Sequence, residues 1–490
     1  MVDSISLLSD EQMREFLSNG YLKLETQLPK HFHQRIYECT EEIFEKDGNP
    51  GNNILPRVPE LGKVFSDPSV VGGLSSVLGP DYVMHSHRHP HINRGPNEGG
   101  GWHKDSYWGF KKIRSHRTRW AMIFYYPQDT PFENGPTGVM PGTHCSEGRS
   151  ENENDEQHLP ITGEAGTCAL VHFDLWHRAY PNTISKMRYM MKFQFTRMSE
   201  PMAPAWNCSD RLWSGSKDQF IWAKHWDWHC GGGTLTASSG LSVHSLCADL
   251  RDEDDGVRLR AISGLGFLGD SSVSAIGTLA DSLSDSNEQV RTNAAYTLGA
   301  IGAPALSVLS DRLSDESEEV RLVAAHGLAQ MGSAAVPSLL EGLKSEDSSR
   351  RGFCAFALGD MGKLSGSEAG LALTDLISDE SELVRFTVAE ALGLVPFEAD
   401  EIIGALCSML KDESGQVRYE AAYSLARIGT KARSAVPALT EALYDEDNRY
   451  VSGHSATALQ RIQSPEANES LINYLSSSRW CSMTNKESTF

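Results

Sequence analysis

The sequence lacks the features of a secreted or membrane-embedded protein. Its nine cysteines are scattered and form no CxxC pair, an arrangement that indicates reduced thiols rather than a disulfide framework. No apolar run approaches the ~18 residues that a membrane-spanning helix needs. Residues 1–12 show no basic segment followed by an apolar one, as a secretory leader would. We therefore expect a soluble, cytoplasmic protein with no membrane partner.

Basic residues are scarce, above all in the second half of the chain. Residues 1–240 contain 28 acidic and 24 basic residues, whereas residues 241–490 contain 37 acidic and 20 basic ones. A surface with this excess of negative charge repels phosphate backbones, so we expect no nucleic-acid partner. The length of 490 residues also exceeds one ordinary domain.

The first half has the mixed pattern of an α+β domain. Ser9 and Asp10 precede the stretch EQMREFLSN and Gly20 follows it, which predicts one helix between these signals. A second helix is expected over 31–46. Short runs rich in β-branched and aromatic residues follow at 82–92, 118–126, 167–173 and 187–195. Glycine and proline clusters separate them, which favours a barrel or a double-sheet jelly roll.

The second half changes to a repeating pattern of two short helices. An acidic residue, Val-Arg, paired small residues and Leu-Gly recur, and Gly302 and Gly332 fit the ends of first helices, with Pro304 and Pro337 at the starts of the next. The aligned arginines, spaced by 33, 30, 30, 34 and 33 residues, are Arg258, Arg291, Arg321, Arg351, Arg385 and Arg418. A weaker seventh unit begins near residue 447.

Such a helix pair cannot bury its apolar face alone, so the units must stack into a solenoid. The pattern resembles the HEAT-repeat superfamily, in particular its short repeats of the phycobilisome-lyase kind. We expect a domain over 1–205, a connecting segment over 206–239, an all-α solenoid over 240–475 and a tail over 476–490.

His103, Asp105 and His177 form the main chemical pattern of the first half. In an HxD pair both side chains point to the same face of a strand or of its end. A histidine on a later strand then completes the 2-His-1-carboxylate triad that binds non-haem iron(II) and leaves coordination positions open. Arg188 lies 11 residues after His177, and its forked guanidinium suits the distal carboxylate of a 2-oxo acid.

The order of these elements resembles the phytanoyl-CoA dioxygenase family, which includes the ectoine hydroxylases. The family pattern of HxD, a strand, NGP…PGSH and H…N.S..R is matched here by HKD, RWAMIFYY, NGPTGVMPGTH and HRAYPNTISKMR, over roughly 8–200. The resemblance implies a double-stranded β-helix, with iron(II), 2-oxoglutarate and O2 as cofactor and co-substrates. It also implies hydroxylation of an unactivated C–H bond, with succinate and CO2 as co-products. Asp105 favours this reaction, or a related oxidation, over halogenation.

Four alternating histidines precede the triad on one predicted strand, and they are His85, His87, His89 and His91. Side chains at alternate positions share one face of a strand. By the family resemblance, His89 is a candidate contact of 2-oxoglutarate and His85 a candidate substrate contact. A partly exposed histidine stripe is an equal alternative, and a second metal site a weaker one. Tyr107 and Trp108 follow the HxD pair and are candidate pocket walls, with core packing as the alternative.

Five tryptophans fall within 206–230, between the two halves. We interpret this segment as an apolar seam between the domains, with a lid over the site as the alternative. Three functions remain open. The first is a small-molecule hydroxylase, and the second a protein hydroxylase whose solenoid recruits a protein partner on its concave face. The third is a scaffold without activity.

Overall fold

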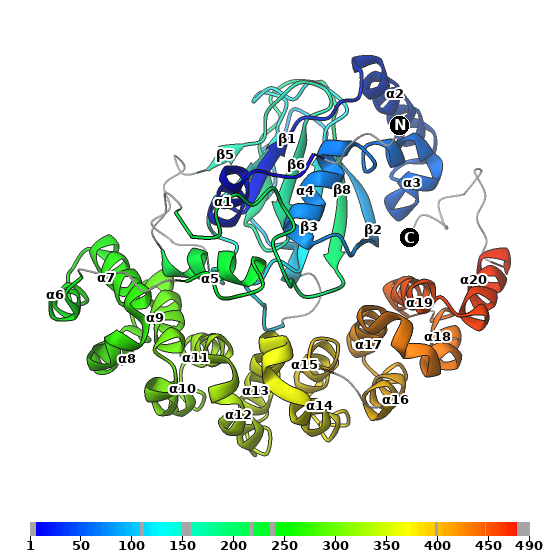
Figure 1. The fold of residues 1–490 in the computed structure, drawn as a ribbon. Helices are drawn as coiled ribbons and strands as arrows, with labels where there is room; N and C mark the ends of the chain where they lie inside the picture. Colours follow the sequence, from blue (N-terminus) through cyan, green and yellow to red (C-terminus); the bar gives the residue numbers. More distant parts are fainter. Residues whose placement is uncertain are drawn as a thin grey trace.

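The computed structural model describes residues 6–107, 112–148, 158–214, 219–235, 241–396, 400–445 and 447–477. It shows an N-terminal domain of sheets and helices, and an arc of helix pairs that partly surrounds it (Figure 1). Among the described residues, no helix is both long and apolar enough to span a bilayer. The eight cysteines in this part of the chain are all free, as expected. Trp108 lies outside the described residues, and so does the side chain of Tyr107.

The N-terminal helices follow the capping signals of the sequence. Helix α1 (Asp10–Asn19) begins after Ser9, which forms a capping box with Gln12, and it ends at Gly20 with φ of 78°. The predicted helix over 31–46 is α2 (Lys30–Asp47). Helices α3 (Ile54–Arg57) and α4 (Pro68–Leu78) precede the long strand β2.

Two sheets form the jelly roll. The larger sheet has the strand order β1-β6-β3-β8-β2, and the smaller one has the order β5-β4-β7. The larger sheet contains β1 (Tyr21–Leu24), β2 (Tyr82–Asn93), β3 (Trp120–Tyr125), β6 (Cys168–His172) and β8 (Arg188–Arg197). The smaller sheet contains β4 (Thr137–Val139), β5 (Leu159–Pro160) and β7 (His177–Ala179). The four strands expected from the sequence therefore all form, and they belong to one sheet.

Helix α5 (Phe220–His229) carries three of the five tryptophans of the tryptophan-rich segment and lies between the two parts of the chain. It contacts α1 on one side, and α7 and α9 of the arc on the other. Trp226 is fully buried against Trp206, with ring centroids 4.8 Å apart. Helix α5 therefore packs against both the N-terminal domain and the arc.

The arc is the expected solenoid of helix pairs. The first helices are α7 (Asp255–Leu268), α9 (Glu288–Ile301), α11 (Glu318–Met331), α13 (Ser348–Met361), α15 (Glu382–Leu392), α17 (Gly415–Ile428) and α19 (Arg449–Ile462). The second helices are α8 (Ile276–Ser282), α10 (Leu306–Arg312), α12 (Val336–Gly342), α14 (Gly366–Thr374), α16 (Asp400–Met409), α18 (Val436–Ala442) and α20 (Pro465–Ser477). A short helix, α6 (Val243–Asp249), precedes them. Gly302 and Gly332 end first helices with positive φ, as predicted.

The repeated arginines link each pair to the next. Arg385, for example, binds the carboxylate of Asp412 in the following repeat at 2.7 Å and donates to the backbone carbonyl of Asp379 at 2.8 Å. Arg258, Arg351 and Arg418 make the same two kinds of contact. Arg291 and Arg321 keep the bonds to the preceding turn. The nearly regular spacing of the arginines thus reflects a ladder of bonds between neighbouring repeats.

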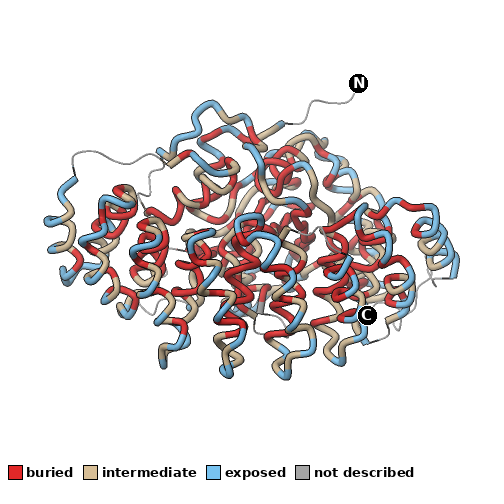
Figure 2. Tube along the Cα trace, turned by 60° about the horizontal axis from the view of Figure 1, so that its bottom comes forward, coloured by how far each residue is buried: buried red, intermediate tan, exposed pale blue. Residues whose placement is uncertain are grey.

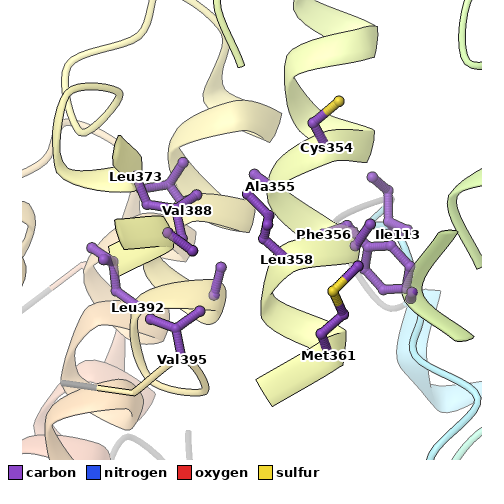
Figure 3. Packing of buried hydrophobic residues seen from close by; sticks show 14 of the residues in the cluster. Ile113, Cys354, Ala355, Phe356, Leu358, Met361, Leu373, Val388, Leu392 and Val395 are labelled. Atoms are coloured by element: carbon purple, nitrogen blue, oxygen red, sulfur yellow. The ribbon is translucent and has the colours of Figure 1, made fainter. Parts of the chain in front are cut away.

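The first helix of each repeat lines the inner side of the arc, and the N-terminal domain lies against it (Figure 1). Figure 2 shows that the outer turns of the arc are mostly exposed or intermediate, whereas buried positions face inward. His116 stacks on His326 of α11 with ring centroids 3.8 Å apart. Ile113 belongs to the same buried apolar cluster as Phe356 and Met361 of α13, next to which Figure 3 shows it.

Buried ion pairs hold the segment that contains Ile113 against the solenoid. Asp360 of α13 is 2% exposed and accepts from Arg119 at 2.8 Å and from Ser115 at 2.6 Å. Glu200 accepts from Arg119 on one side and from Arg427 of α17 on the other, each at 3.0 Å. Each part of the chain therefore supplies a carboxylate that binds an arginine of the other.

Replacing Asp360 by alanine should destabilise the protein by about 3 kcal/mol, because it leaves buried arginines with one carboxylate fewer. Thermal melting followed by tryptophan fluorescence measures the loss, since Trp228 lies under Arg119. Glu341→Ala is the matched control, because Glu341 forms an exposed pair with Lys344 and such pairs contribute little. Equal melting temperatures for the two variants would contradict this role of Asp360.

Candidate metal centre

The predicted iron ligands come together where the loop after β2 meets strand β7. The backbone N–H of His103 donates to the carbonyl of His177 at 3.0 Å, and the N–H of His177 donates back at 3.1 Å. Asp105 begins the 3-10 helix η3 (Asp105–Tyr107) directly after this bridge. One possible ligand atom from each of the three side chains lies within 4.8 Å of the other two. The fold therefore brings the three predicted ligands together into one compact donor set.

Backbone carbonyls orient both imidazoles. Nδ1 of His103 lies 3.0 Å from the carbonyl of Gly101, and Nδ1 of His177 lies 2.9 Å from the carbonyl of Leu175. A carbonyl can only accept, so each Nδ1 carries the proton and each Nε2 keeps its lone pair. This is the arrangement in which histidine binds a metal through Nε2.

The electrostatics of the site keep these groups in their metal-binding forms. Burial lowers the pKa of His177 to about 4, so its imidazole is neutral near neutral pH. Burial alone would raise the pKa of Asp105, but the ammonium of Lys192 and the neighbouring imidazoles hold it well below its usual value. One carboxylate and two imidazoles, at these distances, fit the 2-His-1-carboxylate set of a non-haem iron(II) site.

Lys192 of β8 is a component of the site that sequence reasoning missed. Its Nζ donates to both carboxylate oxygens of Asp105, at 2.8 and 2.9 Å, and its side chain is 5% exposed. The available signal was a lysine in the middle of the predicted strand MRYMMKFQF, since lysine is rarely buried without a partner.

Arg188, the predicted co-substrate anchor, is almost fully buried at the start of β8. Its Nε donates to the carbonyl of Gly135 at 2.9 Å. Gly135 is the glycine of the NGP motif, so one role of this motif is to hold Arg188 in place. Its Nη1 has no hydrogen-bond partner among the described residues, and Arg188 is 1% exposed. A buried guanidinium N–H without a partner is costly, so this position suits an anionic ligand such as a carboxylate.

The four histidines of β2 lie on one face, as the alternation predicted. The rings of His87 and His89 are parallel with centroids 6.1 Å apart, and those of His89 and His91 are 4.9 Å apart. His89 lies opposite Lys192 in the sheet register, and Asn49 is 3.3 Å from its Nε2. Its role as a 2-oxoglutarate contact stays a prediction. His91 lies nearer to Arg188 along the strand, and its Nε2 is buried without a partner among the described residues.

His85, the predicted substrate contact, is buried between β2 and the solenoid. Its Nε2 lies 3.1 Å from Nε2 of His454 in α19, and its ring centroid is 5.2 Å from that of Trp120. A contact with a residue 369 positions away could not be read from the sequence. The substrate role of His85 also stays a prediction.

Comparison with known proteins agrees with this division of the chain. Residues 7–190 match the family model of phytanoyl-CoA dioxygenase (PhyH). Residues 243–329, 306–393, 371–460 and 403–480 match the model of HEAT repeats. A search of curated proteins finds no match.

Several solved structures are similar to this chain, including the following three. A non-heme monooxygenase, the ThoJ-Ni complex, is 16% identical over 40% of this chain and 82% of that one, with a TM-score of 0.32. The alpha ketoglutarate dependent carbocyclase SnoK from nogalamycin biosynthesis is 16% identical over 39% and 85%, with a TM-score of 0.33. EctD from S. alaskensis with 2-oxoglutarate and 5-hydroxyectoine is 16% identical over 40% and 78%, with a TM-score of 0.34. Similarities at this level assign neither a substrate nor a reaction.

The family match and the donor set define the class of the N-terminal domain. It is a phytanoyl-CoA dioxygenase-like domain of the 2-oxoglutarate-dependent, non-haem iron oxygenases, and it is followed by a HEAT-repeat solenoid. The jelly-roll fold and the solenoid that the sequence predicted are therefore confirmed, and the match over 7–190 together with the donor set agrees with iron(II) and 2-oxoglutarate as cofactor and co-substrate.

His103→Ala and Asp105→Asn should each abolish stoichiometric iron binding and keep the fold, because His103 is exposed and an asparagine retains an oxygen for Lys192. Elemental analysis measures the iron, and circular dichroism checks the fold. His31, an exposed histidine of α2, is the matched control, and His31→Ala should bind iron normally. Normal iron content in both site variants would falsify the ligand assignment.

Proposed function

We propose that this protein hydroxylates an unactivated C–H bond of a small molecule, with succinate and CO2 as co-products. The observation that carries the proposal is the pairing of a complete triad with a buried arginine whose Nη1 has no partner among the described residues. The first group suits iron(II), and the second suits the distal carboxylate of 2-oxoglutarate.

The residues of this chain hold and orient the reacting groups. His103, Asp105 and His177 would bind iron(II), and Arg188 would bind 2-oxoglutarate. When bound, these groups and O2 supply the oxidising chemistry. Lys192 keeps Asp105 ionised and fixes its carboxylate. Burial of His177 and Arg188 excludes water from the side where the co-substrate would lie.

The solenoid favours a small-molecule substrate over a protein substrate. The inner helices, which a protein target was expected to occupy, contact the N-terminal domain of the same chain through α9, α11, α13, α17 and α19. A protein partner would therefore bind elsewhere on the solenoid. A scaffold without activity is disfavoured, because all three iron ligands and Arg188 are present. The cytoplasmic location and the predicted domain bounds stay predictions.

Succinate release in the presence of iron, 2-oxoglutarate and either a metabolite library or a protein lysate tests the proposal. Small molecules should stimulate release, and His103→Ala should give none. Stimulation by lysate proteins alone would favour the protein hydroxylase.

Arg188→Ala should raise the KM for 2-oxoglutarate at least about tenfold, because a charge-assisted bond contributes about 1.5–3 kcal/mol and each 1.4 kcal/mol is a factor of ten. Steady-state succinate formation measures KM. Arg35→Ala, which removes an exposed arginine of α2, should leave it unchanged. An unchanged KM in Arg188→Ala would mean that another residue anchors the co-substrate.

A further inference from the structure

The inner face of strand β8 runs from the co-substrate anchor to the solenoid. Arg188, Lys192 and Thr196 lie at alternate positions and therefore share this face. Each interval of four residues spans about 13 Å of strand. Lys192, which binds the iron ligand Asp105, stands midway between Arg188 at one end and Thr196 at the other.

This order leaves one side of the iron for the substrate. If 2-oxoglutarate lies between the iron and Arg188, as the proposed function requires, the substrate must approach from the side of Thr196. The side chains of that region come from β2, β3 and β8, and they include His85, His87 and Trp120.

Helices α17 and α19 of the solenoid cover that side. Tyr423 of α17 hydrogen-bonds Thr196 and packs on Trp120, with ring centroids 5.4 Å apart. Tyr450 of α19 has its hydroxyl 2.6 Å from Nδ1 of His87. Both helices therefore contact residues of the substrate side directly.

A small cavity lies between the N-terminal domain and α17, near the predicted iron ligands. Ser106, which follows Asp105, lines it together with Glu420 and Tyr423 of α17. Its volume is about 30 Å³, enough for about two water molecules. One carboxylate oxygen of Glu420 is buried there without a hydrogen-bond partner among the described residues.

In the hydrogen bond between His85 and His454, the donor can be identified. The backbone N–H of His87 donates to Nδ1 of His85 at 3.1 Å, so Nε2 of His85 carries the proton. That Nε2 donates to Nε2 of His454 at 3.1 Å. Burial lowers the pKa of His85 well below its usual value and that of His454 to about 3, so both rings are neutral. His454 thus orients the residue that the sequence predicted as a substrate contact.

The charge at this side of the site is positive. Arg449, the first residue of α19, lies next to Tyr450, with its guanidinium 5.3 Å from the Tyr450 ring. Burial, and then the positive charges of Lys192 and Arg449, lower the pKa of His87 and of His89 to about 4. Asp105, an acidic group that also acts on His87, is a predicted iron ligand. Lys192 is already bound to Asp105, so an anionic group on a substrate would be met here chiefly by Arg449.

We propose that α19 of the solenoid forms a wall of the substrate site, with Tyr450 and His454 as positioning residues and Arg449 selecting a small anionic substrate. The proposal rests on the proposed function, because it takes the iron and 2-oxoglutarate positions from it. It assigns the solenoid a part in specificity as well as in stability.

Oxidation directed by the bound iron tests the position of α19 without a substrate. Full-length protein loaded with Fe(II) is treated with ascorbate and hydrogen peroxide, and the radicals formed at the metal oxidise side chains close to it. Peptide mass spectrometry should show oxidation of Tyr450 or His454 several-fold above that in His103→Ala. Tyr444, which is 56% exposed, reports background oxidation and should not differ between the two proteins.

The outcome separates this proposal from the proposed function. A protein that fails to bind iron refutes the metal centre, and elemental analysis of the same sample detects this. If iron is bound and α19 is oxidised no more than in His103→Ala, α19 is not a wall of the site.

Stimulation of 2-oxoglutarate turnover by panels of small carboxylates and phosphates, neutral compounds and amines tests the substrate class. Anions should stimulate turnover, and Arg449→Glu should weaken the apparent affinity for the stimulating anion at least tenfold. Arg449→Lys should retain most of the affinity for this anion. The KM for 2-oxoglutarate should stay unchanged in both Arg449 variants. Absence of stimulation by any anion, or equal affinity in Arg449→Glu, overturns the anionic class.

A matched pair of variants tests His454 as a positioning residue. His454→Ala removes the acceptor of the His85 proton and should raise the KM for the stimulating compound several-fold. His454→Gln supplies an amide oxygen as acceptor and should return this KM to the value of the unchanged protein. Equal KM values in both variants, at equal melting temperatures, mean that His454 only fills space.

Discussion

The structure depends on the buried contact between Arg119 of the N-terminal domain and Asp360 of the solenoid. Two charges that are each less than a tenth exposed cannot be separated without desolvation cost, so the domains are held in one arrangement. Glu200 extends the contact to Arg427 of α17. The network therefore fixes two inner helices of the solenoid relative to strands β3 and β8.

This arrangement matters for the candidate metal centre, because the segment that contacts the solenoid follows Asp105 closely in the chain. Asp105 lies shortly before the segment that carries Ile113, Arg117 and Arg119, and that segment is held by α13. On the other side of the site, β2 is held by α19 through His85 and His87. The solenoid thus holds both edges of the metal centre, which a flexibly attached repeat domain could not do.

The solenoid supplies a rigid surface for this purpose because each repeat is bonded to the next. The arginine ladder ties the first helix of one repeat to the turn of its neighbour, for example Arg418 to Asp445 at 2.6 Å. Nearest-neighbour bonding of this kind gives an array a defined curvature. A curved inner face is what allows helices as distant in sequence as α9 and α19 to contact one compact domain.

The sequence by itself determined the local elements and the chemistry of the site. Capping residues such as Ser9 and Gly20 act within a few positions, and the spacing of His103, Asp105 and His177 along the chain was enough to predict that they form one donor set. Only the tertiary structure decided which surfaces meet. Periodicity shows that a helix face is apolar or charged, but not which distant face covers it, because that choice depends on the summed complementarity of both surfaces. The pairs Arg119–Asp360, His85–His454 and Lys192–Asp105 are of this kind, and each joins residues at least 87 positions apart.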